Sequence, residues 1–259
     1  MTKAIGVTFR EGVTTITLQA PKRRNALSLD MLTQLHDSLV AVADDNACRA
    51  IILTGDQTFS AGQDIAEIQQ GLTRSVSARE HLIQHYLPVL ETMVKIPKPI
   101  IATIRGYAAG AGLSLALAAD IRIASDTAYF RTGFTSIGLV PDVGISFLLP
   151  RIVGLGRATA MMLLDREISA AEATAAGLIL FAVNDSLLDA DALRVASDLA
   201  QSAHSVSLTK RLLGDSVWDA LRSAFDREAS YQNHALASDD AREGIAAFLE
   251  HRAPIFSGS

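Results

Sequence analysis

Residues 106–120 read Gly-Tyr-Ala-Ala-Gly-Ala-Gly-Leu-Ser-Leu-Ala-Leu-Ala-Ala-Asp, and this stretch decides the fold. The apolar run at 99–104 that precedes it is typical of a buried strand. Gly106, Gly110 and Gly112 then interrupt the strand, and an apolar helical pattern follows at once. Such a glycine turn leaves backbone N–H groups unpaired at a helix N-terminus, where the helix dipole is positive. The sequence therefore predicts a site for an anion, or for an oxygen that becomes negative during a reaction.

The composition limits the class of protein. The chain has 259 residues, of which 49% are hydrophobic and 20% charged, so it can bury a sizeable core. A formal net charge of −5 without a basic stripe argues against a nucleic-acid partner. The single cysteine, Cys48, excludes an internal disulfide and suits a reducing compartment, so we expect a cytoplasmic protein. No apolar run reaches the roughly 18 residues of a membrane span, and residues 1–6 lack the apolar core of a secretion signal.

Strand and helix patterns alternate along most of the chain, which is the pattern of an α/β fold. The expected strands are 7–9, 13–18, 50–54, 100–104 and 121–124, and the expected helices are 29–42, 79–94 and 113–119. From Asp189 onward the pattern is helical only. We therefore predict a core over residues 1–188 and a helical extension over residues 189–259.

Three motifs that suggest other chemistry are incomplete. Gly110 and Gly112 begin a dinucleotide-binding fingerprint, but Leu115 takes the place of its third glycine. His81 and His85 have the spacing of metal ligands on a helix, but the glutamate of the metalloprotease pattern is missing and no third ligand is evident. No serine lies in the Gly-x-Ser-x-Gly turn of a serine hydrolase. We therefore expect neither a metal nor any other cofactor.

Several loops recur in a fixed order along the chain. They are 25–27 (Asn-Ala-Leu), 59–65 (Phe-Ser-Ala-Gly-Gln-Asp-Ile), 106–120, 137–144 (Ile-Gly-Leu-Val-Pro-Asp-Val-Gly) and 243–252 (Glu-Gly-Ile-Ala-Ala-Phe-Leu-Glu-His-Arg). In order and spacing, these motifs resemble the crotonase, or enoyl-CoA hydratase/isomerase, superfamily over residues 12–256. The glycine turn and the Gly-Leu-Val-Pro-Asp loop look most like PaaG-type and Δ3,Δ2-enoyl-CoA isomerases of that family.

The resemblance implies a crotonase-type spiral of ββα turns with C-terminal helices that form a homotrimer or a dimer of trimers. It implies an acyl-CoA thioester as substrate, and an oxyanion hole made of the backbone N–H groups of Gln63 and Ala111. The glycine turn predicts the second of these donors independently. Lys22 and Arg24 would offset phosphate charge. The substrate-binding positions that the resemblance carries over are Lys22, Arg24, Ala26, Ala61, Asp64, Ile65, Ala109, Gly110, Ser114, Phe134, Ile137, Leu139 and Phe248, with Phe130 beside the acyl pocket.

The chain departs from the hydratases of the family at both catalytic glutamates. Ser114 and Phe134 stand in their places, and neither side chain can activate water or deliver a proton. Asp142 occupies a position at which the resemblance implies the acidic residue of an isomerase. One carboxylate suffices to take a proton from one carbon and return it to another. We therefore expect an enoyl-CoA isomerase in which Asp142 is the proton shuttle, with a pKa raised above the ~3.9 of a free side chain by apolar neighbours.

Other interpretations stay open from the sequence. Asp142 can be a turn residue that caps the next helix. It can also be the nucleophile of an aroyl-CoA dehalogenase, but that group pairs it with a histidine, and Leu87 stands at the matching position while His85 lies two residues away. A hydratase and a non-catalytic acyl-CoA binder are the remaining alternatives, and the acyl chain of the substrate is not specified.

Overall fold

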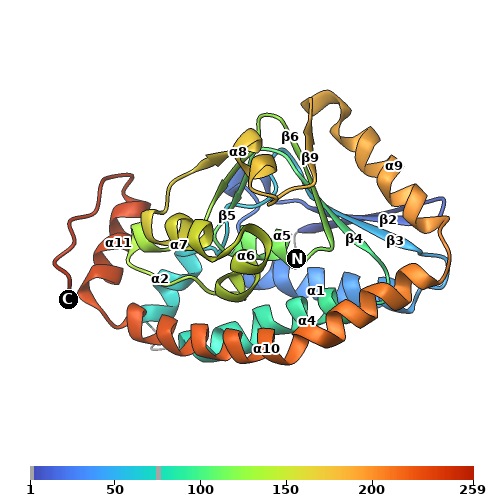
Figure 1. Cartoon of the computed structure of the whole chain (residues 1–259). Helices are drawn as coiled ribbons and strands as arrows, with labels where there is room; N and C mark the ends of the chain where they lie inside the picture. Colours follow the sequence, from blue (N-terminus) through green and yellow to red (C-terminus); the bar gives the residue numbers. More distant parts are fainter. Residues whose placement is uncertain (1–2, 74–76) are drawn as a thin grey trace.

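The computed structural model describes residues 3–73 and 77–259 and has two sheets (Figure 1). The larger has the order β1-β2-β3-β4-β6-β9, in which β1 is antiparallel to β2 and the other neighbours are parallel. Its strands are Ile5–Arg10 (β1), Val13–Leu18 (β2), Ala50–Gly55 (β3), Ile100–Ile104 (β4), Ile121–Ser125 (β6) and Phe181–Val183 (β9). The smaller sheet consists of Tyr107–Ala109 (β5), Tyr129–Arg131 (β7) and Ile168–Ser169 (β8).

Helices cover both faces of the larger sheet (Figure 1). On one face, α1 (Leu29–Asp44) buries a stripe of apolar residues at helical spacing, and the Ser28 hydroxyl caps it by accepting the Met31 N–H. On the other face, α9 (Leu188–Ala200) packs its own apolar stripe against alternate strand residues such as Ile52. Because both of their faces are buried, the central strands β3 and β4 are almost continuously apolar, as the sequence predicted.

Short helices connect the strands and shape one end of the molecule. Their bounds are Pro21–Arg23 (η1), Ile65–Thr73 (α2), Ala78–His81 (α3), Leu82–Tyr86 (η2), Leu87–Lys95 (α4), Ala111–Leu117 (α5), Thr135–Ile137 (η3), Ile145–Val153 (α6), Leu155–Leu164 (α7), Ala170–Ala175 (α8) and Asp185–Leu187 (η4). The helical extension consists of Ser205–Leu236 (α10) and Asp239–Leu249 (α11), after α9. The long α10 runs along α3, α4 and α6, and α11 packs against η3 and α2.

The predicted helix over 79–94 is interrupted by a π-helical turn, η2. Pro88 at the start of α4 explains the interruption. Proline has no N–H to donate to the carbonyl four residues earlier, and its ring pushes that carbonyl away, so the preceding turn widens. The predicted helix over 113–119 instead begins at Ala111, directly after the positive-φ residue Gly110.

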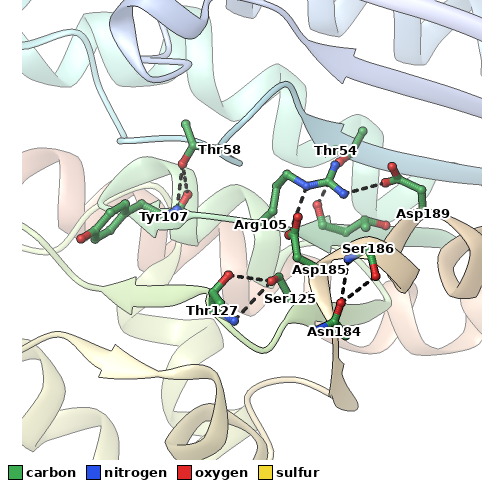
Figure 2. Close-up of polar contacts among 11 residues, drawn as sticks. Thr54, Thr58, Arg105, Tyr107, Ser125, Thr127, Asn184, Asp185, Ser186 and Asp189 are labelled. Carbon is green, nitrogen blue, oxygen red and sulfur yellow. Dashed lines mark hydrogen bonds and ion pairs between the residues drawn. The ribbon is translucent and has the colours of Figure 1, made fainter.

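Side-chain hydrogen bonds tie the loops at the ends of the strands together (Figure 2). Arg105, just after β4, pairs with Asp185 at 3.5 Å and with Asp189 at 3.2 Å, which holds the start of α9 against the sheet. Thr58 accepts the Tyr107 N–H through its hydroxyl at 2.7 Å. The segment before the 59–65 loop is therefore fixed to β5, which leads into α5.

Candidate active site

Two glycine turns from distant parts of the chain lie against each other. Gly62 has φ +99° and Gly110 has φ +53°, both in the region that favours glycine. A Cβ atom on Gly62 would lie only 2.8 Å from the Ala109 carbonyl oxygen and 3.3 Å from the Ala111 nitrogen. The close approach therefore needs glycine, and it brings the 59–65 loop to the N-terminus of α5.

The backbone N–H groups that follow these glycines have no acceptor within the described part of the chain. The Gly62 N–H donates to the Ser60 hydroxyl at 3.1 Å, and the Gly110 N–H donates to the Arg131 carbonyl at 3.2 Å. No hydrogen bond to a described residue uses the N–H of Gln63 or Ala111. These are the two donors that the sequence analysis singled out.

Gln63 and Ala111 both line one cavity of about 130 Å³. Ten of the residues carried over from the sequence line it: Ala61, Gln63, Ile65, Ala109, Gly110, Ala111, Phe134, Ile137, Leu139 and Phe248. Phe248 comes from α11 of the same chain. Sequence reasoning missed the other lining residues, Arg131, Gly133 and Ser136, which belong to the end of β7, the loop after it and η3.

The expected coenzyme-binding residues Lys22, Arg24, Ala26 and Asp64 do not line this cavity. Lys22 and Arg24 are exposed, and the backbone of Arg24 is joined to the cavity wall because the Ala61 N–H donates to the Arg24 carbonyl at 2.9 Å. Ala26 is half-buried in the same segment.

The side chain of Asp64 has structural partners instead. Its carboxylate pairs with Arg23 and accepts the N–H groups of Ala66 and Glu67 at 3.1 and 3.3 Å, at the start of α2. Both carboxylate oxygens of Asp64 therefore have partners within the chain, and the expected place of Asp64 in a coenzyme-binding segment stays a prediction.

Two further predicted neighbours of the ligand are core residues. The Ser114 side chain is fully buried in α5 and donates to the Asp142 carbonyl at 3.1 Å, so it joins α5 to the Asp142 loop and does not line the cavity. Phe130 is fully buried because β7 turns it into the core, whereas Phe134 reaches the cavity.

Asp142 is fully buried and is held by two side-chain amides. One carboxyl oxygen, Oδ2, accepts from Gln63 Nε2 at 3.0 Å and from Gln232 Nε2 at 2.8 Å. The other, Oδ1, has no hydrogen-bond partner in the described chain. The expectation that Asp142 faces the cavity is corrected accordingly: the carboxyl group does not line it and is linked to it through the Gln63 side chain.

The protonation of Asp142 follows from its surroundings. Burial, followed by the negative charge of Glu228, raises the pKa of Asp142, the hydrogen bonds from Gln232 and Gln63 oppose the rise, and the net value is about 8. The direction is the one expected from apolar neighbours. An aspartic acid with such a pKa exchanges its proton near neutral pH.

Helix α10 fixes the Asp142 loop from the far side. Glu228 accepts the N–H of Gly144 at 2.6 Å and of Ser146 at 2.8 Å, and burial raises its own pKa to about 7. Gln232, one helical turn later, also accepts the Val140 N–H at 3.1 Å. Glu228 therefore takes the capping role at the start of α6, and the Asp142 side chain does not cap that helix.

The positions of the histidines bear on the metal and dehalogenase alternatives. The rings of His81 and His85 are 5.2 Å apart, and burial together with the charge of His85 lowers the pKa of His81. No cluster of three or more potential metal ligands occurs in residues 3–73 and 77–259. Leu87 and both histidines lie away from the residues that line the cavity.

Across the described residues, none of the helices has the length and apolar character needed to span a membrane.

Comparison with known proteins identifies relatives along almost the whole chain. A family model described as Enoyl-CoA hydratase/isomerase matches residues 8–259. The chain is 38% identical to 1,2-epoxyphenylacetyl-CoA isomerase of Escherichia coli (strain K12), over 96% of both proteins. It is also 38% identical to a probable enoyl-CoA hydratase of Rhodobacter capsulatus, over 96% of this chain and 95% of that protein.

A solved structure supports the same relationship. The enoyl-CoA hydratase/isomerase from Pseudoalteromonas atlantica T6c superposes with a TM-score of 0.87, at 34% identity, over 98% of this chain and 100% of that chain. The expected α/β spiral of ββα turns with C-terminal helices is confirmed. The chain belongs to the enoyl-CoA hydratase/isomerase, or crotonase, superfamily.

Proposed function

We propose that the protein is an enoyl-CoA isomerase in which Asp142 shuttles a proton and the N–H groups of Gln63 and Ala111 hold the thioester oxygen. The observation that carries the proposal is the unpartnered Oδ1 of Asp142. Burying a carboxyl oxygen without a hydrogen-bond partner costs free energy, and such an exception in a folded protein points to a functional role. Asp165, the other carboxyl group bonded to cavity residues, is saturated by donors and is available for no such role.

The proposed reaction needs one carboxylate and two donors. Because Asp142 does not line the cavity, the proposal requires the acyl group to reach this carboxyl beside the Gln63 side chain. There Asp142 takes a proton from the carbon between the thioester and the double bond, and the electron pair moves onto the thioester oxygen to give an enolate. The Gln63 and Ala111 N–H groups stabilise that charge, and one such donor is typically worth roughly 2.7–4 kcal/mol. Asp142 then returns the proton two carbons further along, and the double bond becomes conjugated with the thioester. No metal or redox cofactor enters these steps.

Several features support an acyl-CoA as substrate. Lys22 and Arg24 are exposed cations beside the cavity, suited to phosphate groups, and Phe248 lines it with about half of its surface exposed. The similarity to 1,2-epoxyphenylacetyl-CoA isomerase supports a ring-derived acyl group as an alternative to a simple enoyl chain. The proposal includes a cytoplasmic homotrimer or dimer of trimers, as the family resemblance implies.

Hydration is the second candidate, because relatives of the same similarity are named probable enoyl-CoA hydratases. Syn addition of water needs one group to activate the water and one to deliver a proton. Ser114 and Phe134 stand in the places of the two hydratase glutamates. Ser114 is buried away from the cavity and Phe134 presents a hydrocarbon ring to it, so neither position supplies an acid or a base. Isomerisation is therefore the better supported reaction.

The deciding experiment measures both reactions on one preparation. The purified protein is incubated with 3-hexenoyl-CoA and with crotonyl-CoA, and the products are followed by ultraviolet absorbance and mass spectrometry. We expect conversion of the first to 2-hexenoyl-CoA and little or no hydration of the second. Hydration at the rate of a dedicated hydratase contradicts the proposal, and binding of both thioesters without turnover identifies a non-catalytic binder.

A further inference from the structure

The wall of the cavity contains two polar side chains that the proposed isomerisation does not use, Arg131 and Ser136. Arg131 ends β7 and is paired in register with Ala109 of β5, two residues before Ala111. Its side chain, 41% exposed, lines the same cavity as Gln63 and Ala111. Most of the remaining lining residues are apolar, which makes these two groups the exception on that wall.

Asp165 holds Arg131 in place. Arg131 Nε donates to the Asp165 carbonyl at 2.8 Å, and Nη2 lies 3.5 Å from Asp165 Oδ2. The carboxylate also accepts the Thr132 hydroxyl at 2.8 Å and the N–H groups of Gly133 and Ser136 at 2.5 and 3.2 Å. One edge of the guanidinium is thus fixed against a buried, saturated carboxylate.

The other edge of the guanidinium is unused. Nη1 of Arg131 has no acceptor among the described residues, and the same holds for the Ser136 hydroxyl. A donor that is already fixed in place loses little side-chain entropy when a ligand arrives. Because Asp165 already balances the charge of Arg131, a second carboxylate would leave the site with a net negative charge in an apolar wall. The pair therefore favours a neutral oxygen as its acceptor.

The size of the cavity restricts the acyl group. Its volume of about 130 Å³ is close to the 150 Å³ or so of an engineered cavity that binds benzene. A single ring or a chain of about six atoms fits that space.

From this geometry we propose that the substrate is an acyl-CoA whose short or single-ring acyl group carries a neutral oxygen (a hydroxyl, carbonyl or ether) that accepts hydrogen bonds from Arg131 and Ser136. The inference rests on the proposed function only in taking an acyl-CoA as the ligand. It makes Arg131 and Ser136 specificity-determining residues, and it assigns no part of the proton transfer to them.

Calorimetric binding of unreactive, saturated thioesters tests the proposal without turnover. The series is hexanoyl-CoA, its 4-, 5- and 6-hydroxy derivatives, and adipoyl-CoA, which ends in a carboxylate. We expect one hydroxy derivative to bind about tenfold or more tightly than hexanoyl-CoA, the gain of a hydrogen bond to a charged donor. Equal affinities for all hydroxy derivatives and hexanoyl-CoA, or tightest binding of adipoyl-CoA, overturn the proposal.

Variants assign the effect to the two side chains. Arg131→Met should abolish the advantage of the hydroxy derivative over hexanoyl-CoA when both are measured on the same variant, whereas Arg166→Met, which removes an exposed cation paired with Glu172, should keep it. If Arg131→Met weakens hexanoyl-CoA equally, Arg131 contacts the coenzyme portion and the proposal is wrong. Ser136→Ala keeps the backbone N–H that Asp165 accepts. If Arg131→Met does not fold, Ser136→Ala is the test. If Ser136→Ala still binds the hydroxy derivative as much more tightly than hexanoyl-CoA as the parent does, the proposed role of these side chains is wrong.

The two proposals fail separately. If no acyl-CoA binds, the proposed function is wrong. If hexanoyl-CoA binds and 3-hexenoyl-CoA is isomerised but no hydroxy derivative gains affinity, only the oxygen preference is wrong.

Discussion

The side-chain amide of Gln63 donates a 3.0 Å hydrogen bond to the buried carboxyl group of Asp142, while Gln63 itself lines the cavity. Its backbone N–H, one of the two proposed oxyanion donors, is free within the described chain. One residue therefore serves both halves of the proposed chemistry: its backbone faces the oxygen of the substrate and its side chain holds the base.

The Gln63 side chain can be tested apart from its backbone. In Gln63→Met the N–H group remains and the amide is lost. The Gln63 hydrogen bond lowers the pKa of Asp142, so its loss should raise that pKa above about 8. The rise of kcat/KM with pH should shift to higher pH, and activity at pH 7 should fall. The exposed Gln201→Met is the matched control, and an unchanged midpoint in Gln63→Met contradicts the role assigned to the amide.

Loss of Glu228 should shift the same midpoint in the opposite direction. The negative charge of Glu228 raises the pKa of Asp142, so Glu228→Gln should lower it and shift the rise of kcat/KM to lower pH. Since Glu228 also anchors the N–H groups of Gly144 and Ser146, the thermal midpoint is recorded alongside, and Glu228→Asp should restore most of the parent profile. A loss of activity with no change in the pH profile would indicate a purely structural role.

Removal of the base should affect turnover and leave coenzyme affinity nearly unchanged. Asp142→Asn keeps the size of the side chain and should lower kcat by roughly 10²–10⁴, the usual effect of a positioned general base. Coenzyme A affinity should stay near the parent value, because the expected coenzyme-binding residues lie elsewhere. Asp219→Asn, on the exposed side of α10, controls for the loss of a carboxylate. Activity within a few-fold of the parent would mean that Asp142 is not the base.

The same variant should change the pH dependence of stability. Folding raises the pKa of Asp142 from 3.8 to about 8, so the folded state binds the proton more tightly than the unfolded state. This contribution to stability is complete below pH 4 and is lost progressively as the pH rises to about 8. Asp142→Asn lacks this loss, so its Tm should rise relative to the parent between pH 5 and pH 8.5. Parallel Tm curves for the two proteins across that range would contradict the raised pKa.

The oxyanion donor in α5 can be removed with little change to the helix. Ala111 is the first residue of α5, where proline is tolerated, so Ala111→Pro removes the N–H that is the proposed oxyanion donor. We expect kcat to fall by about 10²–10³. Ala111→Gly keeps the N–H and controls for the altered side chain, and equal rates for the two variants would exclude the donor.

Local sequence patterns predicted the elements that bury a periodic face. The helix over 29–42 and the five expected strands of the larger sheet are present, whereas its sixth strand, β9, was missed. The strands of the smaller sheet are only two or three residues long, too short for periodicity to reveal. The π turn before Pro88 was missed because the apolar helical spacing continues across it, although the proline is the residue that interrupts the helix.

In the candidate site, some residues could be predicted from the local sequence and others could not. The glycine turn at Gly110 predicted the Ala111 donor from local physics, whereas Gln63 and Asp142 entered only through the family resemblance. Gln232 was missed, although it bonds directly to Asp142, because the two residues are 90 positions apart. Glu228 on the same helix was missed for the same reason, and a pair of polar residues on a long helix gives no local sign of burial.

Gly138 and Gly244 allow the turn after η3 and helix α11 to approach each other closely. A Cβ on Gly244 of α11 would lie 2.4 Å from the Ile137 carbonyl oxygen, and one on Gly138 would lie 2.7 Å from the Asp240 carbonyl oxygen. The turn that carries Ile137 and Leu139 is thus in backbone contact with the helix that carries Phe248. The turn on the inner wall of the cavity and the helix at its outer end are therefore packed together as one unit. A larger acyl group has to displace both together, so altering the specificity for acyl size requires paired changes in the turn and in the last helix.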